Sequence, residues 1–498
     1  MDVLANLLGG FQAAFSPTYL LICLLGVLLG QIVGALPGIG PSAAIALLLP
    51  ITFGGDPTSA LIMFAGIYAG SQYGGTLTSV LVNVPGEASG VMTAVDGHQM
   101  ARQGRAGVAL GIAAIGSFIA GTVGLVGLVL LAPTLAGFAL AFGPPEYFAL
   151  VLLGLTCLAV VGDSVIKGLA MGVAGLLLST VGIDSQTGVP RLNFGQLWLL
   201  DGIEFIVLAV ALFGLGEVLA TCNMGTAQPV IDKIGRMLPS REDWRAARGP
   251  IARGSVIGFI VGVLPGTGAT IAAFVSYIVE KRLAKDPSRF GRGAIEGVAG
   301  PESANNGAVS GSFVPMFSLG VPGSGATAIM LGALIMYGLR PGPDLFHTNS
   351  DMIWTVIASM FIANVLLLIL NLPLAGVFAR LLRVPYKWLY PPIVAICITG
   401  VYSQANSIHD CWMLVVFGAL GWGMKRYDWP IAPAVLGLVL GPMFETTLRQ
   451  SMTMSHGSFS IFVTRPISAI LVFGALLAVL TPVALHMISR TRTRAPAP

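Results

Sequence analysis

Charge is scarce in this chain, and so are long polar stretches. Asp, Glu, Lys and Arg make up 10% of the 498 residues, whereas the hydrophobic types make up 55%. The mean hydropathy is +0.85. A typical soluble domain has about 25% charged residues, so this chain lacks the charges that would cover a water-facing surface. No polar stretch longer than about 30 residues interrupts the apolar runs, which leaves no room for a sizeable domain outside a membrane.

Three further absences narrow the class of protein. The apolar runs do not alternate every second residue as a membrane β-barrel requires, so helices are the remaining way to satisfy a backbone in lipid. The five cysteines show no paired spacing for zinc or redox chemistry and are expected to be small buried apolar residues: Cys23, Cys157, Cys222, Cys397 and Cys411. No Gly-x-x-x-x-Gly-Lys-Ser/Thr loop is present to bind the phosphates of ATP. The sequence predicts an all-α polytopic membrane protein whose energy comes from a gradient or a partner.

Continuous apolar runs predict about ten to twelve transmembrane segments. The candidate spans are residues 17–35, 58–80, 108–132, 144–162, 165–183, 202–222, 351–372, 389–404, 411–424, 430–444 and 466–488. Two more apolar regions, 36–53 and 251–345, are interrupted by Pro and Gly.

Positive charge is distributed very unevenly along the chain. No Lys or Arg precedes Arg102, eleven fall between Lys233 and Arg292, and three more lie in the C-terminal tail. The positive-inside rule predicts that those loops and the tail are cytoplasmic and that the N-terminus is outside. The start of the chain has no basic n-region, so we expect the first apolar segment to remain as a helix.

An internal repeat divides the chain. Gly30–Gly40 (GQIVGALPGIG) recurs as Gly258–Gly268 (GFIVGVLPGTG), and a second related element follows each copy, Asn83–Ser89 (NVPGEAS) and Gly320–Thr327 (GVPGSGAT). Only the second copy is preceded by a basic stretch, which indicates inverted-topology halves with a substrate site between them. The predicted division is a first membrane half at 1–223, a basic cytoplasmic linker at 224–253, a second membrane half at 254–489 and a cytoplasmic tail at 490–498.

The run 254–279 has a Pro-Gly pair near its middle and basic loops at both ends. A simple span would put one of those loops outside. If the break reverses the chain as a re-entrant hairpin, both loops stay cytoplasmic and the broken backbone lines protein or water.

Each Pro-Gly pair would end one helix and let the next begin with free N–H groups, which attract anions. The freed carbonyls could bind Na⁺, although no firm metal site is expected. Buried polar side chains cluster at the same places. The predicted substrate- and ion-binding residues are Pro37, Gly38, Gly40, Ser42, Gln72, Thr76, Asn83, Pro85, Gly86, Pro265, Gly266, Gly268, Thr270, Glu302, Asn305, Asn306, Pro322, Gly323 and Ser324.

Two plainer interpretations stay open. The Gly, Ser and Thr residues could serve only close helix packing, with the Pro-Gly pairs bending helices. Glu302, a candidate for coupling H⁺ or Na⁺ to transport, could be a carboxylate exposed at the membrane surface. The remaining membrane-region charges, Glu217 among them, are interpreted as helix-end charges.

Four motifs carry a resemblance that extends over essentially the whole chain. They are Gly34–Gly40 (GALPGIG), Tyr68–Thr76 (YAGSQYGGT), Asp96–Arg102 (DGHQMAR) and Pro301–Asn306 (PESANN). Together they resemble the large membrane subunit of the tripartite tricarboxylate transporters, the TctA family of bacterial permeases. The loop at Asp96 departs from the family pattern, which usually has an aromatic residue and a proline after Asp-Gly, and its role is therefore open.

The resemblance implies a permease of the bacterial inner membrane without enzymatic activity or a cofactor. It would work with a small four-helix membrane subunit and a periplasmic binding protein that delivers carboxylates, driven by a Na⁺ or H⁺ gradient. Two alternatives remain: an anion channel lined by backbone carbonyls, and an intramembrane serine protease using Ser324 with His347, His409 or His456 as base. The matched break in each half disfavours the protease.

Overall fold

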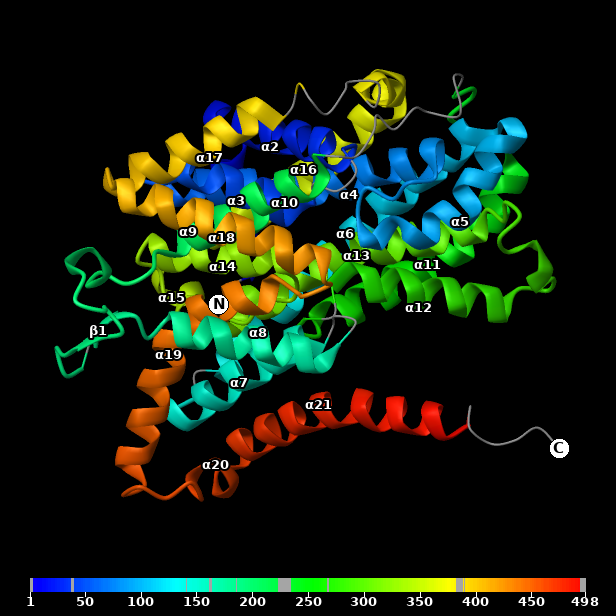
Figure 1. Ribbon diagram of the computed structural model, residues 1–498. Coiled ribbons are helices and arrows are strands. Elements are labelled where there is room, and N and C mark those ends of the chain that lie inside the picture. The colour runs from blue at the N-terminus through cyan, green and yellow to red at the C-terminus, as the bar shows by residue number, and fades with distance from the viewer. Residues whose placement is uncertain are drawn as a thin grey trace.

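A computed structural model describes residues 3–36, 40–139, 141–160, 164–184, 186–222, 234–266, 268–381, 388 and 390–492. Within these ranges the protein is a bundle of α-helices (Figure 1). The first half contains α1 (Val3–Ala14), α2 (Pro17–Gly34), α3 (Pro41–Thr52), α4 (Pro57–Val82), α5 (Val91–Met100), α6 (Ala106–Ala139), α7 (Pro144–Val160), α8 (Val165–Leu178), α9 (Phe205–Ala209) and α10 (Gly216–Thr221).

The second half contains α11 (Arg241–Val263), α12 (Gly268–Leu283), α13 (Glu296–Leu319), α14 (Gly325–Met336), α15 (Leu345–Thr348), α16 (Ser350–Leu381), α17 (Tyr390–Ala405), α18 (Ile408–Arg426), α19 (Ala432–Met454), α20 (Ile461–Thr464) and α21 (Pro466–Arg492). Short 3-10 turns lie at 88–90, 197–199 and 287–289, and wide π-helical turns at 101–105 and 210–215. Helix α11 begins inside the range predicted as a linker.

Each predicted apolar segment is mostly helical where the structure describes it, which confirms the helical assignment. Among the described residues, Pro17–Gly34, Ala88–Phe138 and Ser350–Phe378 are helical stretches long and apolar enough to cross a membrane. One small feature was not predicted: β1 (Gly182–Ile183) pairs antiparallel with β2 (Pro190–Arg191) in a loop that projects from the bundle (Figure 1).

The repeated sequence builds the same local packing twice. Helix α2 lies against α4, and α11 lies against α13. In both pairs the contact is made by glycines at every fourth residue of the first helix. A Cβ added at Gly34 would lie 2.0 Å from the Ser71 carbonyl oxygen, and one added at Gly262 would lie 2.5 Å from that of Ala308. The long helices also end alike, in a left-handed residue, Asn83 after α4 and Gly320 after α13. The two copies therefore share both sequence and structure.

Helices α11 and α12 form an antiparallel hairpin on either side of the break at 264–266. The Arg253 guanidinium, in the middle of α11, pairs at 2.5 Å with the carboxylate of Glu280 in the last turn of α12. Both helices also pack on α13, whose residues 297–318 are all buried.

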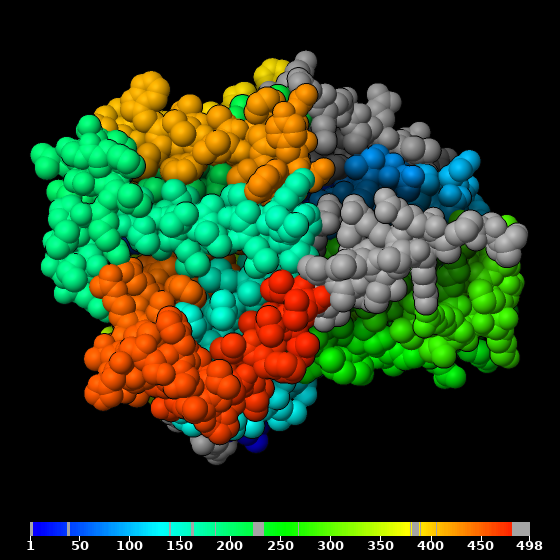
Figure 2. All heavy atoms as spheres, turned by 60° about the horizontal axis from the view of Figure 1, so that its bottom comes forward, coloured from blue at the N-terminus to red at the C-terminus, as the bar shows by residue number. Residues whose placement is uncertain are grey.

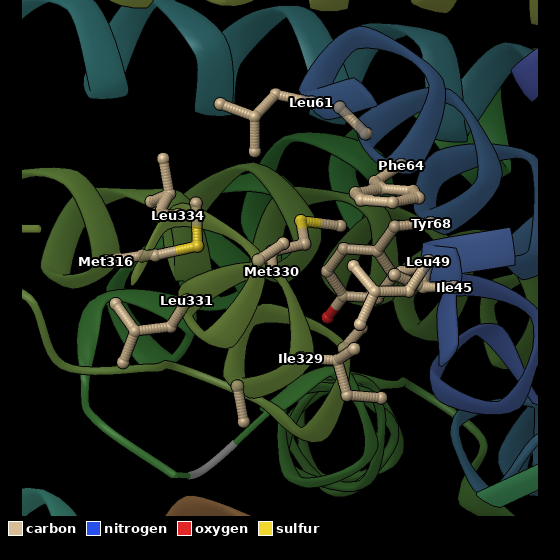
Figure 3. Packing of buried hydrophobic residues seen from close by; sticks show 14 of the residues in the cluster. Ile45, Leu49, Leu61, Phe64, Tyr68, Met316, Ile329, Met330, Leu331 and Leu334 are labelled. Atoms are coloured by element: carbon tan, nitrogen blue, oxygen red, sulfur yellow. The ribbon is translucent and has the colours of Figure 1, made fainter. Parts of the chain in front are cut away.

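The core between the halves is apolar. Figure 3 shows Ile45 of α3 and Phe64 and Tyr68 of α4 facing Met330 and Ile329 of α14. Helices α19, α20 and α21 lie at one end of the molecule (Figure 2), where Arg465, just before α21, pairs with Glu146 of α7 at 2.6 Å. The interdigitated core fixes α3, α4 and α14 relative to one another, and so positions the breaks next to it.

Candidate functional site

Four helices begin at the wall of one cavity of about 660 Å³. Its lining includes the first residues of α3, α12, α14 and α19, namely Gly40–Ser42, Gly268–Thr270, Ser324–Ala326 and Ile431–Pro433. A helix N-terminus leaves backbone N–H groups without intrahelical partners and carries about half a positive charge. The wall therefore presents the positive ends of several helix dipoles to the cavity.

Local sequence explains why these ends are open. Pro41 starts α3 at a position where its missing N–H costs nothing, and the N-cap residue Gly40 has no side chain to occupy the donors. Gly266 (φ 78°) and Gly268 (φ 60°) supply the left-handed backbone that turns the chain from α11 into α12. Helix α14 differs, because Ser324 and Thr327 form a reciprocal capping pair.

One carboxyl group in the cavity wall, that of Glu87, follows directly after Pro85 and Gly86. Its Oε2 accepts from Gln72 Nε2 at 2.9 Å and lies 3.5 Å from Ser89 Oγ, and Ser89 donates to Gln72 Oε1 at 3.0 Å. The other oxygen, Oε1, is buried and has no hydrogen-bond partner among the described residues.

An ion pair contributes to the opposite wall. Lys425, in the last turn of α18, contacts the carboxylate of Glu217 on α10, and both residues line the cavity. The second oxygen of Glu217, Oε1, is buried without a partner in the described part of the chain. Glu217 lies in the first turn of α10, as its interpretation as a helix-end charge predicts, and it also lines the cavity. With Glu87 included, the described wall holds two carboxylates for one ammonium group.

Glu302 lies behind the cavity and is fully buried, in the middle of α13. Its two oxygens accept from Thr93 Oγ1 at 2.5 Å and Thr76 Oγ1 at 2.8 Å. Asn306, one turn later, donates to Ser117 Oγ at 2.7 Å and to the Glu302 carbonyl at 3.1 Å. The alternative of a surface-exposed Glu302 is wrong, because α13 continues through this position and neighbouring helices enclose it.

The structure brings nine of the nineteen predicted binding residues to the cavity. Those in its wall are Gly40, Ser42, Gln72, Pro85, Gly86, Gly266, Gly268, Thr270 and Ser324. Outside the wall as described are Thr76, Asn83, Pro265, Glu302, Asn305, Asn306, Pro322 and Gly323. Pro37 and Gly38 lie outside the described residues. Asn306 lines a second, far smaller cavity with Ser310 and Asn364.

Sequence reasoning missed Glu87, Glu217 and Lys425 as cavity residues. Glu87 carried a usable signal, since it is a carboxylate next to a Pro-Gly break inside the repeated element. Lys425 and Glu217 carried none, because 208 positions separate them along the chain and only the packing of α10 against α18 brings them together.

The segment Asp96–Arg102, expected to be a loop, is helical, and Asp96 on α5 has a structural role. Asp96 Oδ1 accepts from the backbone N–H groups of Gly291, Gly293 and Ala294 at 2.8–2.9 Å, and Oδ2 accepts from Tyr277 Oη at 2.9 Å. Its carboxylate thereby joins α5 to the turn that precedes α13. His98, which departs from the family pattern, contacts the Val80 carbonyl through Nδ1 at 3.0 Å.

The side chains of the described residues bear on two possible chemistries, metal binding and serine-dependent hydrolysis. Among the described residues, no group of three or more His, Cys, Asp or Glu side chains is arranged to hold a metal ion. Ser324 Oγ contacts Thr327, and the described cavity wall contains no histidine to serve as a base. The described wall thus does not contain the Ser–His pair on which the serine-protease alternative depends.

Comparison with known proteins identifies the family. The sequence pattern of the "Tripartite tricarboxylate transporter TctA family" matches residues 20–436. The chain belongs to the TctA family. It is therefore a multi-pass membrane component of a tricarboxylate transport system.

Two proteins of Agrobacterium vitis are similar to this TctA-family chain. The "Uncharacterized 52.8 kDa protein in TAR-I ttuC' 3'region" is 48% identical over 471 residues, which are 94% of each chain. The "Uncharacterized protein in TAR-II ttuC' 3'region" is 48% identical over 212 residues, 43% of this chain and 88% of that protein. No solved structure matches the chain.

Proposed function

We propose that this chain is the large permease subunit of a tripartite, ion-gradient-driven secondary transporter that imports tricarboxylates or related carboxylates. A periplasmic binding protein would deliver the substrate, and a small four-helix membrane subunit would complete the complex in the bacterial inner membrane. The N-terminus is placed outside and the C-terminal tail in the cytoplasm, following the positive-inside rule.

The convergence of four helix N-termini on one cavity carries this proposal. Each N-terminus near an anion contributes about 0.3–2 kcal/mol, depending on burial, so several together can bind a group with two or three carboxylates. Lys425 also lines the cavity, where its ammonium group pairs with Glu217. The volume of about 660 Å³ is in the range of small-molecule sites.

The matched packing of the two halves supports alternating access as the mechanism. Elements from both halves meet at the cavity, α3 from the first and α12 and α14 from the second. We place the α11–α12 hairpin as a re-entrant element and the two halves in opposite orientations in the membrane. Rocking of one half against the other would then expose the cavity to each side in turn.

The experiment is uptake of labelled citrate into proteoliposomes containing the complete complex, with and without an imposed ion gradient. We expect accumulation against the citrate gradient only when an ion gradient is present. Gradient-independent flux at channel rates would contradict a transporter and indicate a channel.

A matched pair of variants tests the anion site itself. Thr270→Asp places a negative charge at the N-terminus of α12, whereas Thr270→Asn has the same shape without the charge. We expect the Asp variant to bind citrate about tenfold more weakly than the Asn variant. Its carboxylate would cancel part of the positive charge of the helix N-terminus and would also repel the carboxylates of citrate. Equal affinities would show that the α12 terminus is not part of the site.

A further inference from the structure

Two carboxyl groups near the cavity, fully buried Glu302 and half-buried Glu87, differ in how their oxygens are hydrogen-bonded. Both oxygens of Glu302 accept a hydroxyl donor, from Thr93 and Thr76, so this group is satisfied as a carboxylate. Glu87 has donors only at Oε2, and its buried Oε1 has none among the described residues. A carboxylate oxygen that is buried without a donor is costly unless the group takes up a proton or a cation.

The charges that line the cavity also indicate Glu87 as the group that takes up a proton or a cation. The described wall contains Glu87, Glu217 and Lys425, and Lys425 is already paired with Glu217. An ionised Glu87 would repel each carboxylate of the substrate inside a partly desolvated space. A second ion that neutralises Glu87 would remove this repulsion, and its uptake would be tied to substrate binding by linkage.

A proton fits the surroundings of Glu87 better than Na⁺. The side-chain groups next to this carboxyl are the Gln72 amide and the hydroxyls of Ser89 and Ser71. Both hydroxyls already donate elsewhere, Ser89 to Gln72 Oε1 and Ser71 to the Tyr68 carbonyl, so their oxygens are engaged. A proton needs only the free Oε1. The charged and titratable groups that face Glu87 are Tyr68 of α4 and Glu302 of α13, with Glu217 and Lys425 across the cavity.

We propose that Glu87 is the proton-coupling residue of this transporter: it takes up one proton together with the anionic substrate and gives it up when the substrate leaves. The proton comes from water on the side where substrate enters, converts the carboxylate of Glu87 to the neutral acid, and returns to water on the other side. No other bond is made or broken. Glu302 is a positioning residue that holds α5 and α13 against α4. This inference rests on the proposed function.

The first test is an infrared titration of the purified full-length chain without any substrate. We expect the carbonyl band of a protonated carboxylic acid to grow as pH falls in the wild type, to be lost in Glu87→Gln, and to persist in the matched variant Glu302→Gln. Loss of the band in Glu302→Gln but not in Glu87→Gln would overturn the assignment. Size-exclusion chromatography checks folding, and Glu87→Asp, which keeps a titratable carboxyl, is expected to retain a band.

The second test measures citrate affinity as a function of pH in the wild type and in Glu87→Gln. Protonation of citrate itself affects both proteins equally, so it cancels in the comparison. Uptake of one proton with the ligand changes affinity about tenfold per pH unit relative to the variant. Parallel pH profiles would overturn the proposal. So would a Na⁺ dependence that is lost in Glu87→Gln, because it would make the coupling ion Na⁺.

The two tests separate this inference from the proposed function. If the wild type binds neither citrate nor other di- and tricarboxylates at any pH, the proposed function fails. The infrared titration still decides whether Glu87 takes up the proton, since it needs no substrate.

Discussion

At the scale of residues, glycine decides how closely helices approach in this protein. The glycines of α2 and α11 lie directly on backbone carbonyls of α4 and α13, where a methyl group has no space. In lipid, where apolar burial between helices gives little gain, such close packing is a main source of association. Single methyl groups should therefore have large effects at these positions.

Gly34→Ala and Gly262→Ala are each expected to destabilise the protein by about 1–3 kcal/mol or more, because the added Cβ would overlap a carbonyl oxygen. Gly376→Ala in α16 is the control, since nothing lies within 4 Å of its added Cβ. Thermal unfolding in detergent measures the effect. Equal melting temperatures for all three variants would contradict the packing argument.

Asp96 is the second residue with a large expected effect. Asp96→Ala leaves three backbone N–H groups and the Tyr277 hydroxyl without their acceptor, and each unsatisfied donor costs about 1–3 kcal/mol. Asp96→Asn retains one acceptor oxygen and should cost less. We expect the melting temperature to be highest for the wild type, lower for Asp96→Asn and lowest for Asp96→Ala. A reversed order would show that the Asp96 carboxylate does not stabilise the junction between α5 and the turn before α13.

At the scale of elements, ion pairs join segments that are remote in sequence. The β1–β2 loop is bound to α19 by Asp184, which accepts from Arg449 Nη2 at 2.8 Å, and Arg191 pairs with Glu445 at 2.7 Å. Asp184 also accepts from the backbone N–H of Gln186 at 2.9 Å. These bonds hold the loop against the C-terminal half of α19, the helix whose N-terminus lines the cavity.

The hydrogen bond from the Gln186 N–H and the pairing with Arg449 hold the pKa of Asp184 well below its ordinary value. A depressed folded-state pKa gives stabilisation that is present above the ordinary value of about 3.9 and is lost as pH falls below it. Amide exchange of Gln186 and Gly188 should therefore speed up at acid pH relative to the intrinsic rate. Asp184→Asn is the control and should show little pH dependence; protection that persists in acid would contradict the prediction.

At the scale of the whole molecule, the cavity is made by both halves. A Cβ added at Gly325 of α14 would lie 3.1 Å from Ser42 Oγ of α3, within the geometry of a disulfide. Paired cysteines at 42 and 325, in a chain from which the five native cysteines are removed, would bridge the halves. We expect oxidation to stop citrate transport and reductant to restore it in the same variant.

The two single-cysteine variants serve as controls for this experiment, and their transport should not respond to oxidant. Transport that continues in the oxidised double variant would show that the halves do not separate at this point during the cycle. Alternating access between these elements would then be wrong.

Several features followed from the sequence because they are local. Apolar runs positioned the helices from 17–35 to 466–488, and Pro-Gly pairs marked the ends of α2 and α11 and the starts of α3 and α12. Glycine at every fourth position, as at Gly258 and Gly262, already indicates close packing. Such signals lie within one or two turns of chain and need no knowledge of distant neighbours.

Only the tertiary structure shows which of the predicted residues line the cavity and which are buried behind its wall. Thr76 and Gln72 are one turn apart on α4, yet Gln72 bonds to Glu87 in the wall while Thr76 bonds to buried Glu302. Lys425 and Glu217 meet because α10 packs on α18, and α19 adds a fourth helix N-terminus from the far end of the chain. The sequence by itself determined an all-helical membrane protein with a repeated break, since periodicity and backbone chemistry are local. Which carboxylate faces the cavity depends on helix rotation and packing, which the fold decides.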